Sequence, residues 1–112
     1  MKPTIKESKK ICSELDLGKY QNIKLIKGGL VNFNFLLKTN KGEFIIRILG
    51  QKITPPKQKR LNYEFDLMEF LDKNKFPYLI PLPIKAKNTK KRLHKINNKN
   101  FWVYKKLPGK SK

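Results

Sequence analysis

A run of alternating apolar and polar residues between positions 22 and 49 is the feature that most limits the fold of this chain. Period-two alternation predicts strands with one buried face, and a third β-rich run covers Phe44 to Leu49. The glycine-rich link 27–29 and the turn 39–42 separate these runs, so three consecutive strands with short connections are predicted to form an antiparallel meander. The alternating apolar residues of the first two strands are Ile23, Leu25, Phe33, Phe35 and Leu37.

A short helix is predicted before the meander. Thr4 and Glu7 have the spacing of a capping box, which predicts a helix over about 5–16. Gly18 is a suitable stop for this helix. The apolar face would carry Ser8, Ile11, Cys12 and Leu15.

A second helix and two more strands are predicted after the meander. Two prolines open a helix over about 57–73, which ends near Asn74. Three further prolines after Phe76 favour an extended path with little ladder hydrogen bonding. Residues 85–99 form a basic loop or wide hairpin, and Phe101–Tyr104 is a last buried strand. The predicted class is α+β, with a five-stranded antiparallel sheet, one packed helix and a short N-terminal helix.

The length of 112 residues leaves room for one domain. The longest unbroken apolar run is Phe101–Tyr104, far short of the roughly 20 residues that span a membrane, so no membrane partner is expected. No signal peptide is apparent, and the lone Cys12 gives neither a disulfide framework nor a cysteine zinc site. We therefore expect a cytoplasmic chain.

The charge balance has two explanations. The chain has 27 Lys and Arg against 8 Asp and Glu, a formal net charge of +19. Such an excess is typical of proteins that bind nucleic acid or another polyanion. Almost all of these cations are lysines, however, and Lys, Asn and Ile are abundant together, which is the composition that AT-rich codons produce. Arginine, which makes bidentate contacts to bases and phosphates, is scarce.

Two charged residues are predicted at apolar positions. Glu64 lies on the apolar face of the second helix and is therefore expected to point toward the core, while Arg47 lies in the aliphatic run 44–49. A buried carboxylate costs several kcal/mol unless it is paired, so each charge is best explained by the other. A structural ion pair, an arginine at the solvent edge and a cation held to meet phosphates all remain open. The rest of that helix face is Leu61, Met68 and Leu71.

The link between the first two strands is a second candidate site. Gly28 and Gly29 let the backbone approach a ligand closely and direct N–H groups at an anion, and Asn32 and Asn34 can add side-chain donors. An ordinary hairpin turn explains the same glycines. The combination is more specific, because a glycine loop, a cation on the third strand and a carboxylate on the next helix form the nucleotide-binding half of a protein-kinase-like fold.

A family resemblance rests on these segments. Residues 26–37 and 41–48 resemble the N-terminal lobe of aminoglycoside phosphotransferase-like kinases, a superfamily that also includes choline kinases, the second type of homoserine kinase and methylthioribose kinase. The resemblance covers about residues 15–109. It implies a protein-kinase-like N-terminal lobe. Further similar segments are Arg60–Glu64, Phe76–Pro77, Ile80–Pro83 and Phe101–Gly109.

The resemblance implies a role for each segment. The loop would lie over the nucleotide triphosphate, Arg47 would touch the α- and β-phosphates, and Glu64 would orient Arg47. The backbone of Lys105 to Leu107 would hydrogen-bond the base of ATP, or of GTP in some members. The residues that the resemblance assigns to nucleotide binding are Gly28, Gly29, Asn32, Asn34, Arg47, Glu64, Lys105 and Leu107, with Ile26, Ile45 and Ile80 as apolar walls around the base.

The catalytic half of such a kinase has no counterpart in the sequence. In the family, the catalytic aspartate, the aspartate that holds Mg²⁺ and the acceptor site all belong to the C-terminal lobe. We therefore expect no catalytic or metal-binding residue here, with residues 1–109 as the nucleotide-binding lobe and 110–112 as the start of a missing lobe. His94 has no acid near it in sequence and is predicted to be a surface histidine.

The predicted function is thus the nucleotide-binding lobe, as a fragment or a split subunit, of a kinase that transfers the γ-phosphate of ATP or GTP to a hydroxyl of a small metabolite. A separate C-lobe chain is a possible partner, and a fold retained without catalysis, as a regulatory partner, is a third reading. The alternative is a basic RNA- or DNA-binding module. In that module the lysines of 85–99 and Arg92 would track phosphates, and Phe101, Trp102 and Tyr104 would stack on bases. That reading requires exposed aromatic rings.

Overall fold

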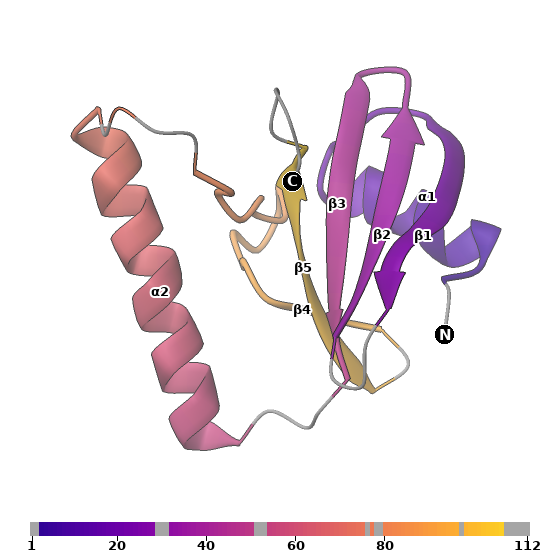
Figure 1. Cartoon of the computed structure of the whole chain (residues 1–112). Helices are drawn as coiled ribbons and strands as arrows, with labels where there is room; N and C mark the ends of the chain where they lie inside the picture. Colours follow the sequence, from indigo (N-terminus) through magenta and orange to yellow (C-terminus); the bar gives the residue numbers. More distant parts are fainter. Residues whose placement is uncertain are drawn as a thin grey trace.

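The computed structural model describes residues 3–28, 32–50, 54–75, 77, 80–96 and 98–106. The five strands form one sheet in the order β1-β2-β3-β5-β4, with every neighbouring pair antiparallel (Figure 1). The predicted α+β class and the five-stranded antiparallel sheet are confirmed, but the fourth strand lies at His94–Ile96, inside the stretch 85–99 that was predicted as a loop or wide hairpin. The elements are α1 (Ile5–Glu14), β1 (Tyr20–Gly28), β2 (Asn32–Thr39), β3 (Gly42–Leu49), α2 (Pro55–Lys73), β4 (His94–Ile96) and β5 (Lys99–Lys105).

Helix α1 begins at the predicted capping box. The Glu7 amide donates to Thr4 Oγ1 at 3.1 Å, and the Thr4 amide donates to Glu7 Oε1 at 2.9 Å. The helix ends earlier than predicted, because Leu15 and not Gly18 follows its last residue. Asp16 adopts a positive φ of 55°, a conformation that Asp tolerates better than most residues, and so the chain turns before it reaches the glycine.

The main core lies between α1 and one face of the sheet. Alternate residues of β2, β3 and β5 point to this face, as the period of two predicted. All four residues of the predicted face are buried: Ser8, Ile11 and Cys12 on α1, and Leu15 directly after it. The cluster consists of Ile11, Cys12, Leu15, Leu17, Ile23, Phe35, Leu37, Phe44, Ile46, Ile48, Phe101 and Val103.

The hairpin between β2 and β3 is tied to the segment that follows α1. Thr39 Oγ1 is buried and donates to the Leu17 carbonyl at 2.7 Å, and Asn40 Oδ1 accepts from the Lys19 amide at 2.7 Å. Gly18 has a φ of 104°, and a Cβ there would lie 2.5 Å from Asn40 Oδ1. A side chain at Gly18 would therefore break this connection.

Helix α2 stands beside the sheet rather than deep within it (Figure 1). Phe65 is the one buried side chain that the structure describes on α2, and its ring packs edge-on against Trp102 with a centroid distance of 5.1 Å. The prediction that Glu64 points toward the core is wrong, because Glu64 is exposed. The large aromatic ring of Phe65 fills the contact with the sheet, and this turns Glu64 to the flank of the helix. The other members of the predicted face, Leu61, Met68 and Leu71, are half-buried.

Candidate functional site

A row of side chains crosses the face of the sheet opposite α1. Asn34 on β2, Arg47 on β3 and Trp102 on β5 lie directly opposite one another in the strand register. Their neighbours Phe35, Ile46 and Val103 belong to the core cluster on the α1 side, so this row points to the other face. Arg47 is half-buried there. Because Trp102 contacts Phe65, α2 covers the same face that carries Arg47.

A second row beside the first is apolar. Leu36 and Ile45 are opposite each other and buried, and the half-buried Tyr104 pairs with Ile45 from β5. The rings of Trp102 and Tyr104 lie 5.2 Å apart. A row of largely buried apolar side chains therefore adjoins a cation on one sheet face.

The site also contains an unsatisfied polar atom. Asn34 Oδ1 is buried and has no hydrogen-bond partner among the residues that the structure describes. It lies on the residue directly opposite Arg47. Buried amide oxygens are nearly always hydrogen-bonded, so a donor from a ligand or from water is expected at this position.

Arg47 and Glu64 are not paired in this structure. Among the described residues no ion pair includes either of them, so the predicted contact across the sheet is wrong. Glu64 is exposed because Phe65 and not Glu64 faces the sheet. The nucleotide role that the resemblance implies for each residue stays a prediction.

Of the other predicted nucleotide residues, some lie on the same sheet, one lies in the segment before β4, and two are not described. Ile26 is half exposed on β1, and Lys105 is exposed at the end of β5. Gly28 and Asn32 lie in the paired ends of β1 and β2, where only their backbone is described. Gly29 and Leu107 lie outside the described residues. Ile80 is half-buried in the segment before β4.

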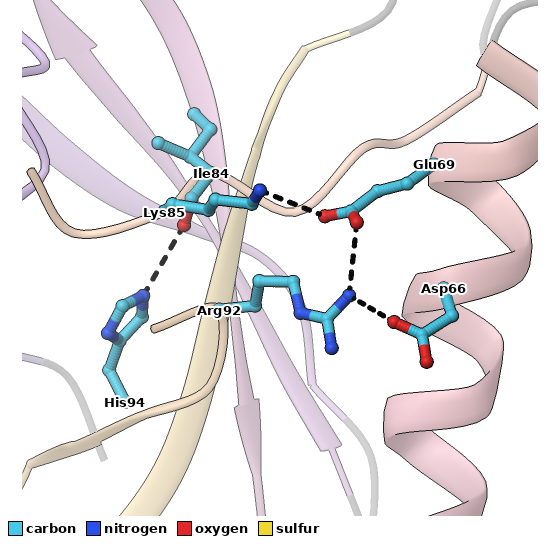
Figure 2. Close-up of polar contacts among 6 residues, drawn as sticks. All are labelled: Asp66, Glu69, Ile84, Lys85, Arg92 and His94. Atoms are coloured by element: carbon cyan, nitrogen blue, oxygen red, sulfur yellow. Dashed lines mark hydrogen bonds and ion pairs between the residues drawn. The ribbon is translucent and has the colours of Figure 1, made fainter. Parts of the chain in front are cut away.

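Arg92 connects the segment before β4 to α2 by ion pairs. This contact was not predicted from the sequence. Arg92 Nη1 lies 2.7 Å from Asp66 Oδ1 and 3.2 Å from Glu69 Oε1, and Lys85 Nζ lies 3.7 Å from Glu69 Oε2 (Figure 2). The guanidinium also lies over the Phe65 ring, 5.4 Å from its centroid. We call these residues, Arg92 with Asp66, Glu69 and Lys85, the Arg92 cluster. The nucleic-acid hypothesis assigned Arg92 to phosphate binding, but Arg92 pairs with Asp66 and Glu69 of the same chain.

The pKa of Arg92 reflects this pairing. Burial lowers the pKa of the guanidinium, but the hydrogen bond to Asp66 and the charges of Glu69 and Asp66 outweigh burial, so the net shift is upward. Arg92 is therefore a permanent cation in the cluster. A sequence signal existed, since arginine is scarce in this lysine-rich chain and suits bidentate pairing with carboxylates.

His94 is not a surface residue as predicted. It is half-buried on β4, and its Nε2 lies 3.4 Å from the Ile84 carbonyl oxygen, to which its N–H donates (Figure 2). Burial lowers the pKa of His94, and the nearby Lys91 lowers it further. The Ile84 carbonyl and Glu14 act in the opposite direction without reversing the shift. The fold therefore favours the neutral imidazole.

The free energy of unfolding should consequently fall as the pH drops from 7.5 to 5.5. In the unfolded chain His94 regains a pKa of about 6.5, so the unfolded state binds the proton more readily than the folded state. The stability that the neutral ring contributes is fully present above the unfolded pKa, and it is lost as the pH falls through the lower folded pKa. Urea unfolding measured across this range tests the slope. His94 is the only histidine of the chain, so His94→Gln should flatten it, and an unchanged slope would contradict the assignment.

An open cavity of about 950 Å³ lies away from the Arg47 row. It is formed by α1, the first turns of α2 and the segment 86–96, and it contains none of the predicted nucleotide residues. We place the candidate site at the Arg47 row despite this cavity, because the row combines a cation, adjoining apolar side chains and an unsatisfied amide oxygen.

The described part of the chain lacks two further kinds of feature. It holds no group of three or more His, Cys, Asp or Glu residues that could bind a metal ion. None of its helices is long and apolar enough to cross a membrane.

The comparisons with known proteins identify the fold. No family model matches the sequence, and no curated protein matches it. Among solved structures, the chain is similar to spectinomycin phosphotransferase APH(9)-Ia, which was crystallised with ADP and spectinomycin. The TM-score is 0.57 and the sequence identity 13%, over 88% of this chain and 29% of that one. The chain thus spans less than a third of the phosphotransferase that it resembles.

The predicted resemblance is therefore confirmed for the fold. The chain shares the fold of part of spectinomycin phosphotransferase APH(9)-Ia, with an antiparallel sheet and flanking helices consistent with a kinase-like N-terminal lobe. The nucleic-acid alternative is not favoured, because Phe101 and Trp102, two of its three stacking rings, are buried in β5.

Proposed function

We propose that the chain is the nucleotide-binding lobe of a small-molecule kinase. The observation that carries the proposal is the row of Asn34, Arg47 and Trp102 on one sheet face, in a fold that a phosphotransferase shares. The similar phosphotransferase was crystallised with ADP, which supports a nucleotide as the ligand. In this proposal ATP or GTP lies along β3, with its base toward Lys105 and its phosphates toward Arg47.

The strand register supports this direction. Phe44 pairs with Lys105 at one end of β3, whereas Asn32, which ends the glycine link, pairs with Leu49 at the other. Arg47 lies between them, two residues from Leu49. Residues in a strand advance about 3.3 Å each, so the base end and the phosphate end are about 10 Å apart along β3 between Phe44 and Arg47.

The lobe would supply binding and not the complete chemistry. Phosphoryl transfer depends on positioning and on electrostatic stabilisation by Mg²⁺, with a base that orients the attacking hydroxyl. In this proposal the Mg²⁺ ligands, the base and the site for a small hydroxyl-bearing acceptor belong to a second lobe, encoded in the same or a separate chain. Arg47 would hold the phosphates by charge, and the apolar row of Leu36 and Ile45 would contact the base.

A nucleotide titration followed by ¹⁵N NMR tests this function. ATP should shift the amide signals of Asn34, Ile45 and Arg47, with weak affinity because one lobe forms only one wall of the cleft. Arg47→Gln should weaken binding at least about tenfold, since a charge-assisted phosphate contact is lost. Lys95→Gln is the matched control, because it removes one exposed cation from β4, an edge strand that is separated from β3 by β5.

Two outcomes would contradict the proposal. Equal weakening by the two variants would indicate that ATP responds only to the net positive charge. Shifts confined to residues outside β2, β3 and β5 would place the ligand elsewhere.

A further inference from the structure

Arg47 lacks the carboxylate partner that its position predicts. Among the described residues no ion pair includes Arg47, and the predicted partner Glu64 is exposed. Two other carboxylates of α2, Asp66 and Glu69, pair with Arg92. Some other group is needed to orient the Arg47 guanidinium, because a long side chain that nothing holds loses its full conformational entropy when a ligand binds.

Asn34 has the complementary defect. Its Oδ1 is buried without a hydrogen-bond partner in the part of the chain that the structure describes. Asn34 lies directly opposite Arg47 in the register of β2 and β3, and residues opposite each other on one face of an antiparallel pair have Cβ atoms about 5 Å apart. An acceptor without a donor is thus next to a side chain that has several N–H donors and no acceptor.

The other described neighbours of Asn34 on this face do not supply the missing donor. Leu36 and Ile45 are buried and apolar, and Trp102 is two strands away. The phosphates of ATP only accept hydrogen bonds, so they cannot satisfy Asn34 Oδ1 either. Arg47 is therefore the described side chain that is best placed to donate to this oxygen.

We propose that Asn34 is the positioning residue for Arg47, with Asn34 Oδ1 accepting the Nε–H of the guanidinium when nucleotide phosphates bind. The Nε–H is the donor of arginine closest to the main chain, and the amide oxygen of asparagine is also close to the main chain. A contact at Nε leaves both terminal amino groups to hold phosphate oxygens as a fork. This role rests on the proposed nucleotide function, and it gives Asn34 the part that the resemblance assigned to Glu64.

A neutral amide suits this role better than a carboxylate. A carboxylate beside Arg47 would form a lasting ion pair and would compete with phosphate for the same cation. A neutral acceptor forms a weaker hydrogen bond and leaves the positive charge to the ligand. Asn34→Asp should therefore have two effects, a stronger contact with Arg47 in the free chain and weaker binding of ATP.

A double-mutant cycle tests the contact without nucleotide. The change in melting temperature caused by Asn34→Asp should be about 1–5 °C more favourable in the presence of Arg47 than in Arg47→Met, which is the range for a cross-strand pair of opposite charges. The difference should shrink in about 1 M salt. Lys27 lies opposite Asn34 on β1, so the same cycle with Lys27→Met is the control.

The cycle can overturn the proposal by itself. If water alone satisfies Asn34 Oδ1, the cycle shows no coupling to Arg47, and the proposal fails. A coupling to Lys27 that equals or exceeds the coupling to Arg47 would also overturn it.

The Nε–H signals of the arginine side chains test the role in binding. The chain has only three arginines, Arg47, Arg60 and Arg92, and the Arg47 signal is the one that is lost from Arg47→Gln. ATP should move this signal downfield in the unmodified chain and not in Asn34→Leu, which has nearly the same size but no amide. Asn34→Leu should also weaken ATP binding about three- to tenfold, because one hydrogen bond is lost.

A charge-matched control completes the binding test. Asn34→Asp should weaken ATP binding at least as much as Asn34→Leu. Asn88→Asp makes the same change of charge in an exposed turn, and it should weaken binding much less. Equal effects of the two aspartate variants would overturn the proposal.

Failure of this inference is distinguishable from failure of the nucleotide function. An ATP affinity unchanged by Asn34→Leu, or an Arg47 signal that ATP moves equally in both chains, overturns the role of Asn34 and leaves the nucleotide function intact. Failure of the unmodified chain to bind ATP overturns the nucleotide function, whereas the cycle still decides whether Asn34 and Arg47 are in contact.

Discussion

Replacing Phe65 by alanine is expected to cost about 3–5 kcal/mol of folding free energy, the usual range for a buried phenylalanine. Phe65 has no exposed surface, and its ring contacts both Trp102 and the Arg92 guanidinium. It is the only described residue of α2 that is fully enclosed. The loss is large against a typical total stability of about 5–15 kcal/mol.

The effect should be concentrated in α2. Phe65 is not part of the core cluster on the α1 side, so β1, β2 and β3 keep their packing when the ring is removed. Hydrogen exchange should therefore accelerate at the amides of α2 while those of β2 and β3 stay protected. Urea unfolding gives the total loss. Phe70→Ala is the control on the same helix. Phe70 is 61% exposed, so this variant should lose little stability. Similar losses from the two variants would contradict the role of Phe65.

Replacing Arg92 by methionine is expected to cost about 1–3 kcal/mol. The variant removes hydrogen bonds to Asp66 and Glu69 and the contact over the Phe65 ring, each of which contributes on the order of 1 kcal/mol. The Arg92 side chain is only 19% exposed, but the Asp66 carboxylate is 67% exposed, and water screens that pair. Methionine keeps most of the apolar volume, so the change isolates the charge.

A lysine at position 92 separates charge from geometry. Arg92→Lys keeps the cation but cannot span the two carboxylates with a planar fork, so it should recover only part of the loss. Thermal unfolding of the two variants and of Lys85→Gln, which removes the longer contact to Glu69, gives the order of effects. Full recovery by lysine would show that only the positive charge matters.

Local patterns predicted the meander of β1, β2 and β3 and the first helix cap, because each depends on residues that are close in sequence. The alternation in β2 and β3 sets which residues face α1, and the Thr4–Glu7 capping box forms between residues three positions apart. The rotation of α2 was not predictable in this way. Glu64 and Phe65 both adjoin the apolar positions of that helix, and the outcome depends on Trp102, nearly 40 residues away in sequence.

The same distinction applies to the candidate site: a feature within one segment was predictable, and contacts between distant segments were not. Arg47 was recognised because a cation in an aliphatic strand is unusual within its own segment, and its position beside Asn34 follows from strand register. The Arg92 cluster joins a helix to a distant irregular segment, so no local period reveals it. The half-burial of His94 likewise depends on Ile84 from a preceding segment.

The strand order also sets the sequence in which the sheet can assemble. Strands β1, β2 and β3 are consecutive and joined by short links, whereas β5 reaches its place between β3 and β4 only after α2 and residues 80–96 have been synthesised. Local pairings form faster than distant ones, so the meander can form on the ribosome while β5 is still absent. During that interval β3 has an open edge beside the apolar run 44–46, which is where premature pairing between nascent chains would begin. Pairing of β5 with β3 closes that edge, so we expect the latest-made of these five strands to limit such pairing between nascent chains.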